Sequence, residues 1–194
     1  MRSINDFVVS PLGSRYNNIK NVGNKELILN TNIYNHQFVN RHAVVKSVPI
    51  LHNTDIEVGD VVIVHHNVFR RWHNMRDEEK NSRSFFNEDT YFISIDQIFL
   101  VSKGKWVAPN GYCFVKPIAS KDSFETNNEK PLIGVLKYSD KSLMQIGLKP
   151  GDLVGFTPES EYEFTIEEEK LYRVFSKAIT IKYEYQGDEE EYNP

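Results

Sequence analysis

The chain has 194 residues, of which 40% are hydrophobic and 26% are charged, and its formal net charge is -4. These values are ordinary for a globular protein and argue against a disordered or fibrous chain. The slight acidic excess argues against a surface shaped throughout for phosphate backbones, because such domains usually carry a marked basic excess.

The first half of the chain predicts short strands that are rich in β-branched and aromatic residues and are separated by Gly, Pro, Asn and Asp. No amphipathic helix of useful length competes with them. Two long segments, residues 13–41 and 69–84, interrupt the series. The predicted strands are residues 7–9, 26–30, 43–48, 61–65 and 91–101.

The second half predicts a similar series with shorter connections. Its predicted strands are residues 112–116, 133–138, 153–156, 162–166 and 172–185. Because the order of strands repeats, the pattern indicates an all-β protein made of two consecutive copies of one unit.

Three pairs of segments support the repeat. In the first pair an apolar strand ends at a proline, and in the second a Gly-Asp turn leads into a strand. The third pair aligns without a gap. The pairs are residues 7–11 with 113–117, 58–62 with 150–154, and 91–98 with 172–179.

The seam is expected within residues 103–111, which are punctuated by Gly and Pro. This predicts a first domain over residues 1–104, a second over residues 105–185, and an acidic flexible tail over residues 186–194.

The lone Cys113 cannot form an intrachain disulfide, and the N-terminus has no apolar segment typical of a signal peptide. No apolar run is long enough to span a bilayer, so we expect a cytoplasmic protein with no membrane contact.

The order of these segments resembles that of the GroES-type co-chaperonin family. The opening strand followed by Pro11-Leu12, the Val58-Gly59-Asp60 strand entry and the closing segment of residues 93–101 each match a family segment. The resemblance implies two tandem GroES-like small β-barrels, with long loops in the first copy, that assemble into a homo-oligomeric ring.

In that family a loop after the first strand carries an aliphatic patch that docks on a GroEL-type chaperonin. Leu27, Ile28 and Leu29 occupy the matching place within residues 13–41, preceded by Lys25-Glu26 where the family usually has two glycines. The resemblance therefore implies a lid that binds a chaperonin through this patch and assists protein folding. Weak docking by each loop would be strengthened by multivalency in the ring.

The segment of residues 69–84 is expected to form a hairpin. By the resemblance, Phe69, Arg70, Arg71 and Trp72 contribute to the roof of the ring or to subunit contacts. Its mixture of basic and aromatic residues is also typical of nucleic-acid surfaces. The acidic run of residues 77–79 would neutralise much of that charge, which favours the roof interpretation.

Other candidate sites are weaker. His65, His66 and His73 could converge on a metal, but no cysteine or well-spaced carboxylate completes the set. No nucleophile elbow or Gly-rich phosphate loop occurs, and Cys113 falls within a strand. We therefore expect no catalytic residue, no metal and no cofactor.

Three classes of function follow. The first is a co-chaperonin-like lid, in the host cytoplasm if the protein is viral. The second is a non-enzymatic structural or assembly protein, for example a phage virion component, that uses tandem barrels for self-association. The third, an enzyme with a GroES-like domain, lacks the Rossmann partner that would bind a dinucleotide.

Overall fold

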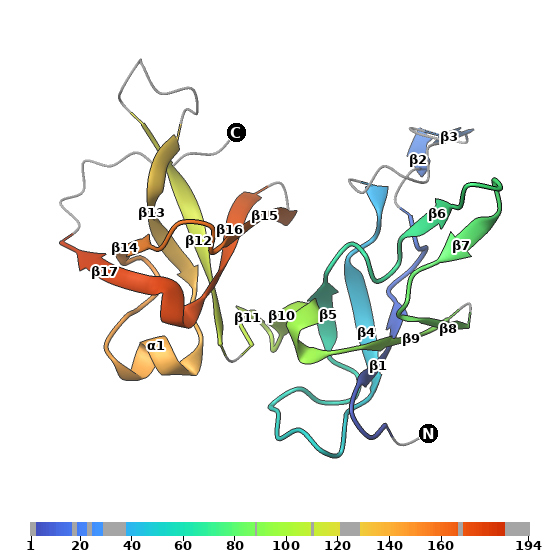
Figure 1. The fold of residues 1–194 in the computed structure, drawn as a ribbon, viewed down its shortest axis with the longest axis horizontal. Helices are drawn as coiled ribbons and strands as arrows, with labels where there is room; N and C mark the ends of the chain where they lie inside the picture. The colour runs from blue at the N-terminus through green and yellow to red at the C-terminus, as the bar shows by residue number, and fades with distance from the viewer. Residues whose placement is uncertain are drawn as a thin grey trace. The chain divides into compact units, whose positions relative to one another are not determined.

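The computed structural model describes residues 3–16, 19–22, 25–28, 38–87, 89–109, 111–120, 129–166 and 169–184 of the chain. It consists mainly of antiparallel β-strands (Figure 1), which confirms the all-β class. Contacts divide the chain into two compact units, Met1–Lys105 and Trp106–Pro194, and each is described by itself. Within the described residues, no helix combines the length and apolar character needed to cross a membrane.

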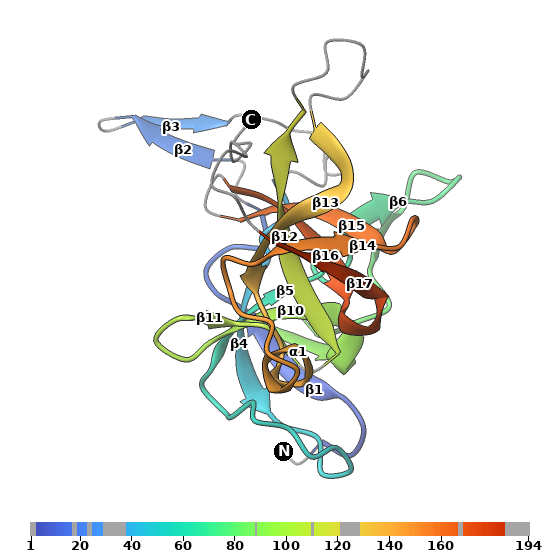
Figure 2. The same cartoon turned by 90° about the vertical axis from the view of Figure 1, so that its left-hand side faces the viewer.

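The first unit contributes six strands to a seven-stranded sheet with the order β11-β10-β5-β4-β1-β9-β8, whose remaining strand, β11, begins directly after Lys105. The strands are β1 (Phe7–Pro11), β4 (His42–Ser47), β5 (Val61–Val64), β8 (Phe85–Asn87), β9 (Thr90–Ile93), β10 (Ile98–Ser102) and β11 (Trp106–Val107). Two hairpins form separate two-stranded sheets (Figure 1 and Figure 2). They pair β2 (Ile19–Val22) with β3 (Lys25–Ile28), and β6 (Arg71–His73) with β7 (Glu79–Asn81).

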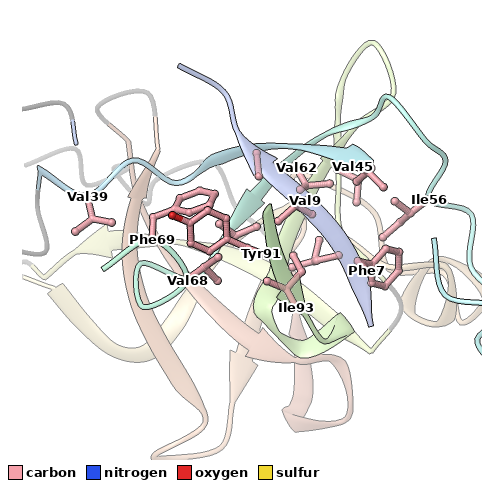
Figure 3. Packing of buried hydrophobic residues seen from close by; sticks show 14 of the residues in the cluster. Phe7, Val9, Val39, Val45, Ile56, Val62, Val68, Phe69, Tyr91 and Ile93 are labelled. Carbon is pink, nitrogen blue, oxygen red and sulfur yellow. The ribbon is translucent and has the colours of Figure 1, made fainter. Parts of the chain in front are cut away.

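The core of the first unit lies on one face of this sheet. Residues from β1, β4, β5 and β9 alternate toward it. Val8 in β1 and Ile63 in β5, which lie between these core residues, are buried as well, so the other face of the sheet is partly covered. Phe69 and Tyr91 pack edge to face, with ring centroids 4.7 Å apart (Figure 3). Both side chains are fully buried, so this aromatic pair anchors the segment before β6 to the sheet.

The second unit holds a six-stranded sheet with the order β15-β16-β12-β13-β14-β17. Its strands are β12 (Tyr112–Ala119), β13 (Glu129–Tyr138), β14 (Leu153–Phe156), β15 (Glu161–Ile166), β16 (Glu169–Phe175) and β17 (Ile179–Tyr183). A short helix, α1 (Lys141–Gln145), precedes β14 and was not predicted from the sequence. Asp140 caps it by accepting a hydrogen bond from the Leu143 amide at 3.0 Å.

The two sheets share one strand order. The sequence β17-β14-β13-β12-β16-β15 corresponds, strand by strand, to β10-β5-β4-β1-β9-β8. The registers agree as well, since Val9 lies opposite Val45 and Tyr91 in one unit while Val115 lies opposite Leu136 and Tyr172 in the other. A bulge precedes Val9 and Val115 alike. The segments aligned in the sequence therefore occupy equivalent positions.

The Gly-Asp turn before β5 and before β14 is built in the same way. Gly59 and Gly151 each adopt φ of 96°, a conformation that favours glycine. The Gly59 amide donates to the Val45 carbonyl at 2.8 Å, and the Gly151 amide donates to the Leu136 carbonyl at the same distance. These bonds attach each turn to the strand beside it.

Two sequence expectations need correction. The strands predicted over residues 91–101 and 172–185 are each interrupted by a 3-10 turn, at Ile95–Gln97 and Ser176–Ala178, which carries the chain from one part of the sheet to another. Within the described residues, neither sheet closes into a barrel, because β8 does not pair with β11 and β15 does not pair with β17. Strands as short as β8 and β11 offer few backbone groups for closure.

Replacing Gly151 by alanine should destabilise the protein by about 1–2 kcal/mol, because an L side chain is strained at this φ. Pro150→Val is the matched control, since Val58 occupies the equivalent place before Gly59, and it should change stability by less than about 0.5 kcal/mol. Urea unfolding followed by circular dichroism measures both. Equal stability of the Gly151→Ala variant and the wild type would contradict the assignment of this turn.

Candidate functional site

The principal candidate site is the arm, which we define as residues 13–41 between β1 and β4. Its described middle part is the β2–β3 hairpin, in which Ile19 lies opposite Ile28 and Lys20 opposite Leu27. The structure thus places the backbone of Leu27 and Ile28 in β3, outside the seven-stranded sheet. Leu29, the third member of the predicted aliphatic patch, lies outside the described residues.

The two ends of the arm are held together at a buried base. Tyr16 forms an isolated bridge with Val39, and both side chains are buried. The Asn40 amide nitrogen donates to the carbonyls of Leu12 and Ser14 at 3.0 and 2.8 Å. Because Asn40 is only 2% exposed, these bonds satisfy an amide that would otherwise be costly to bury.

A joint formed by Arg15, Tyr16, Arg71 and Asn81 connects this base to the β6–β7 hairpin. The Arg15 guanidinium donates to Asn81 Oδ1 at 2.8 Å and to the Phe69 carbonyl at 3.2 Å. The Arg71 amide donates to the Tyr16 hydroxyl at 2.8 Å, and the Arg71 guanidinium lies 5.0 Å from the centre of the Tyr16 ring. The arm and the hairpin are therefore coupled through four side chains.

The joint combines two cationic groups with buried aromatic rings. Arg15 lies over both Phe85 and Tyr91, 5.5 Å from each ring centre. Burial lowers the pKa of Arg15, and the nearby Arg71 charge lowers it further, while Tyr91 opposes the shift. Burial also raises the pKa of Tyr91, whose hydroxyl is buried without a hydrogen-bond partner. Favourable cation–π contacts thus offset part of the cost of burying Arg15.

The residues predicted as roof or subunit contacts do not form one continuous surface. Phe69 is fully buried in the core, so its side chain is not available to a second copy. Trp72 is 43% exposed and lies opposite Lys80 on the hairpin. Arg70 and Arg71 are intermediate in exposure. Only part of the predicted contact set therefore reaches the surface.

Acidic residues neutralise basic ones on the same hairpin. Arg71 forms an ion pair with Glu79 at 3.1 Å, and Lys80 forms one with Glu78 at 3.0 Å. Hydrogen bonds from Lys80 and Asn74 lower the pKa of Glu78. This pairing reduces the positive field that a nucleic-acid surface would need.

The three histidines are not brought to one point that could hold a metal. The rings of His65 and His66 stack with centroids 4.3 Å apart, while His73 lies in β6. Nδ1 of His65 already accepts a hydrogen bond from the Asn67 amide. Over the ranges that the structure describes, no group of three or more His, Cys, Asp or Glu side chains has metal-binding geometry.

The second unit contains a network of charged residues that joins β13 to β16. Glu129 accepts hydrogen bonds from Lys170 and from the Tyr172 hydroxyl, both at 2.6 Å. Burial, with the hydrogen bond to Glu129, raises the pKa of Tyr172 to about 12. Burial disfavours the charged form of Lys170, but its bonds to Glu129, Tyr172 and Glu163 outweigh this and raise its pKa. The network thus links β13 and β16, the two strands that flank β12.

No known protein-family model matches this chain. A search of curated proteins also finds no match.

Of the four joint residues, sequence reasoning named only Arg71, and it did so as a roof or subunit contact. Arg15, Tyr16 and Asn81 are isolated in the sequence, and they come together only when the ends of the arm meet the β6–β7 hairpin. One sequence signal could have identified two of them. Arg15 and Tyr16 lie at the start of a long insertion, where contacts that hold the two ends of the insertion together are expected.

Tyr16→Phe should destabilise the first unit by about 1 kcal/mol, because it removes the acceptor for the Arg71 amide and keeps the ring. Tyr91→Phe is the matched control, since it removes a buried hydroxyl that has no partner, and it should be neutral or stabilising. Urea unfolding together with amide exchange at Arg71 measures both effects. A greater loss of stability from Tyr91→Phe would contradict the joint.

Cys113 should react slowly with thiol reagents in the native protein. Burial, aided by the charge of Asp140, raises its pKa to about 12, so at pH 8 only about one thiol in ten thousand is ionised. We expect reaction with an aromatic disulfide reagent to be at least about a hundredfold slower than in urea-unfolded protein. Equal rates in the two states would show that the thiol is accessible and ionisable.

Proposed function

We propose that this protein is a non-enzymatic binding protein of the co-chaperonin type, which presents the arm to an apolar groove of a GroEL-type chaperonin. The observation that carries the proposal is the construction of the arm. Its ends are fixed by the Tyr16–Val39 bridge and by Asn40, while β3 pairs with β2 and belongs to neither large sheet.

A fixed base and a separate hairpin suit docking for a physical reason. Anchoring the two ends limits the conformations that the intervening chain loses on binding, which reduces the entropic cost. Leu27 and Ile28 supply the kind of small aliphatic side chains that an apolar groove binds. The ordered base thus favours binding without requiring a large interface.

The common strand order of the two units supports a tandem arrangement of one GroES-like unit. The connection between β12 and β13 is shorter than the arm, and Pro131-Leu132 there belongs to β13. We therefore propose one docking arm per chain, so that strong binding depends on several chains acting together in a homo-oligomer.

The test is co-sedimentation of the protein with a GroEL-type chaperonin, with and without nucleotide. The wild type should bind when nucleotide is present, and serine at all three of Leu27, Ile28 and Leu29 should weaken binding by at least about tenfold. The matched control replaces Ile50 and Leu51 by serine, because these aliphatic side chains are 64% and 67% exposed elsewhere in the first unit. Equal binding by the triple variant and the control would refute docking through the arm.

The second candidate is a structural or assembly protein in which the arm contacts another copy of the chain. The observation that favours it is the ordered joint, which holds the arm against β6 and β7. In that case the triple variant should lose self-association, and the wild type should not sediment with the chaperonin.

A further inference from the structure

The sheet of the second unit ends in two strands, β15 and β17, that differ in chemistry. Within the described part of the chain, no strand pairs with the outer edge of either. An unpaired edge presents backbone donors and acceptors that can template pairing with another chain. Proteins usually protect such edges with charge, proline, bulges or short length.

The β17 edge is only partly protected. A bulge at Thr180 interrupts its pairing with β14, and Lys182 adds a charge, but the strand contains no proline and its central residues Thr180, Ile181 and Lys182 are exposed. In the seven-stranded sheet the equivalent strand, β10, is covered by β11, which follows it in the chain. The same fold therefore contains an example of a strand added at this position.

The β15 edge offers a partner of opposite charge. Glu161 and Glu163 are both exposed on it, whereas β17 carries Lys182, whose side chain is 50% exposed while it contacts Asp152. By contrast, the edge strands of the seven-stranded sheet are short, with three residues in β8 and two in β11. The positive charge on β17 and the negative charges on β15 therefore favour contact between these two edges.

Strand direction allows the same pairing. All neighbouring strands in the six-stranded sheet are antiparallel, so its first and last strands run in opposite directions. When a second copy continues the sheet in the same orientation, its β15 lies antiparallel to β17. Antiparallel pairing of this kind needs no reversal of either sheet.

The charged side chains also lie on matching faces. Lys182 lies opposite Val154, and Glu161 lies opposite Val174. Val154 and Val174 belong to the same core cluster, and residues directly opposite each other in a sheet share a face. Lys182 of one copy and Glu161 of the next would therefore be on one face of the continued sheet, within reach of a cross-strand ion pair.

We propose that β17 pairs with β15 of a second copy of this chain, in a head-to-tail arrangement that continues the six-stranded sheet. Such heterologous contacts generate a ring when the rotation closes. The inference rests on the self-association part of the proposed function and is independent of chaperonin binding. Because a single strand pair buries less than a typical stable interface of about 1,600 Å², association should be weak and dependent on concentration.

The experiment is sedimentation velocity of the full chain over a concentration series up to about 200 µM, at low and high salt. Lys182→Glu replaces the cation of β17 by a carboxylate that would face Glu161 of the second copy, and it removes the exposed ion pair with Asp152. Glu161→Lys places a cation on β15 that would face Lys182, and it leaves the Lys170–Glu163 ion pair intact. Each variant should weaken association by at least about tenfold. The control Gln145→Glu adds a carboxylate on the exposed side of α1 and should leave association unchanged.

Mixing the two variants provides the decisive comparison. In an alternating assembly, the altered β17 of one variant meets the altered β15 of the other with opposite charges, so the mixture should recover association that neither variant shows alone. A wild type that remains monomeric, or a mixture that recovers nothing, would overturn the pairing. So would loss in Lys182→Glu without loss in Glu161→Lys, because β15 would then have no part in the contact.

No chaperonin is present in this assay. Its failure therefore leaves docking through the arm standing, and failure of docking through the arm leaves this pairing standing.

Discussion

The pairing of β1 with β4 is the constraint on which the first unit depends. It brings Pro11 opposite Ala43, and the Leu12 amide donates to the His42 carbonyl just beyond the ladder. The two ends of the arm are therefore adjacent before any contact within the arm is made. This proximity allows Tyr16 to bridge to Val39 and Asn40 to bind the carbonyls of Leu12 and Ser14. The joint with the β6–β7 hairpin follows from the same geometry, since Tyr16 is then placed beneath Arg71.

The second unit uses the same ladder for a different purpose. β12 pairs with β13 in the register that β1 and β4 share, but the connection between them is shorter and leads into the Glu129–Lys170–Tyr172 network. One unit therefore carries an arm where the other carries a cross-link between strands. This division is consistent with a chain that presents one binding element and uses its second unit for stability and association. In the proposed assembly, the charged edge of β15 and the exposed edge of β17 would supply the association.

The arm and the β17 edge would contribute to binding in different ways, the arm within one chain and the β17 edge between chains. Docking of a small aliphatic segment is weak by itself, because ordering the chain opposes the gain from burying a few side chains. Association of several chains raises the effective concentration of arms and so strengthens binding without new contacts. A weak head-to-tail contact between second units would supply such association while leaving the arm of each first unit for its partner.

The sequence by itself determined the all-β class, most of the central strands and the three pairs of equivalent segments, because alternating β-branched residues and Gly-Asp turns are local signals. It also located Leu27 and Ile28 in an insertion, although their role stays a prediction. Only the tertiary structure decided that Phe69 is a core residue, that the strands predicted over residues 91–101 and 172–185 are interrupted by 3-10 turns, and that the sheets remain open over the described residues. The joint of Arg15, Tyr16, Arg71 and Asn81 likewise depended on it, because these contacts join residues more than fifty positions apart in the chain, and no local pattern records which distant side chains meet.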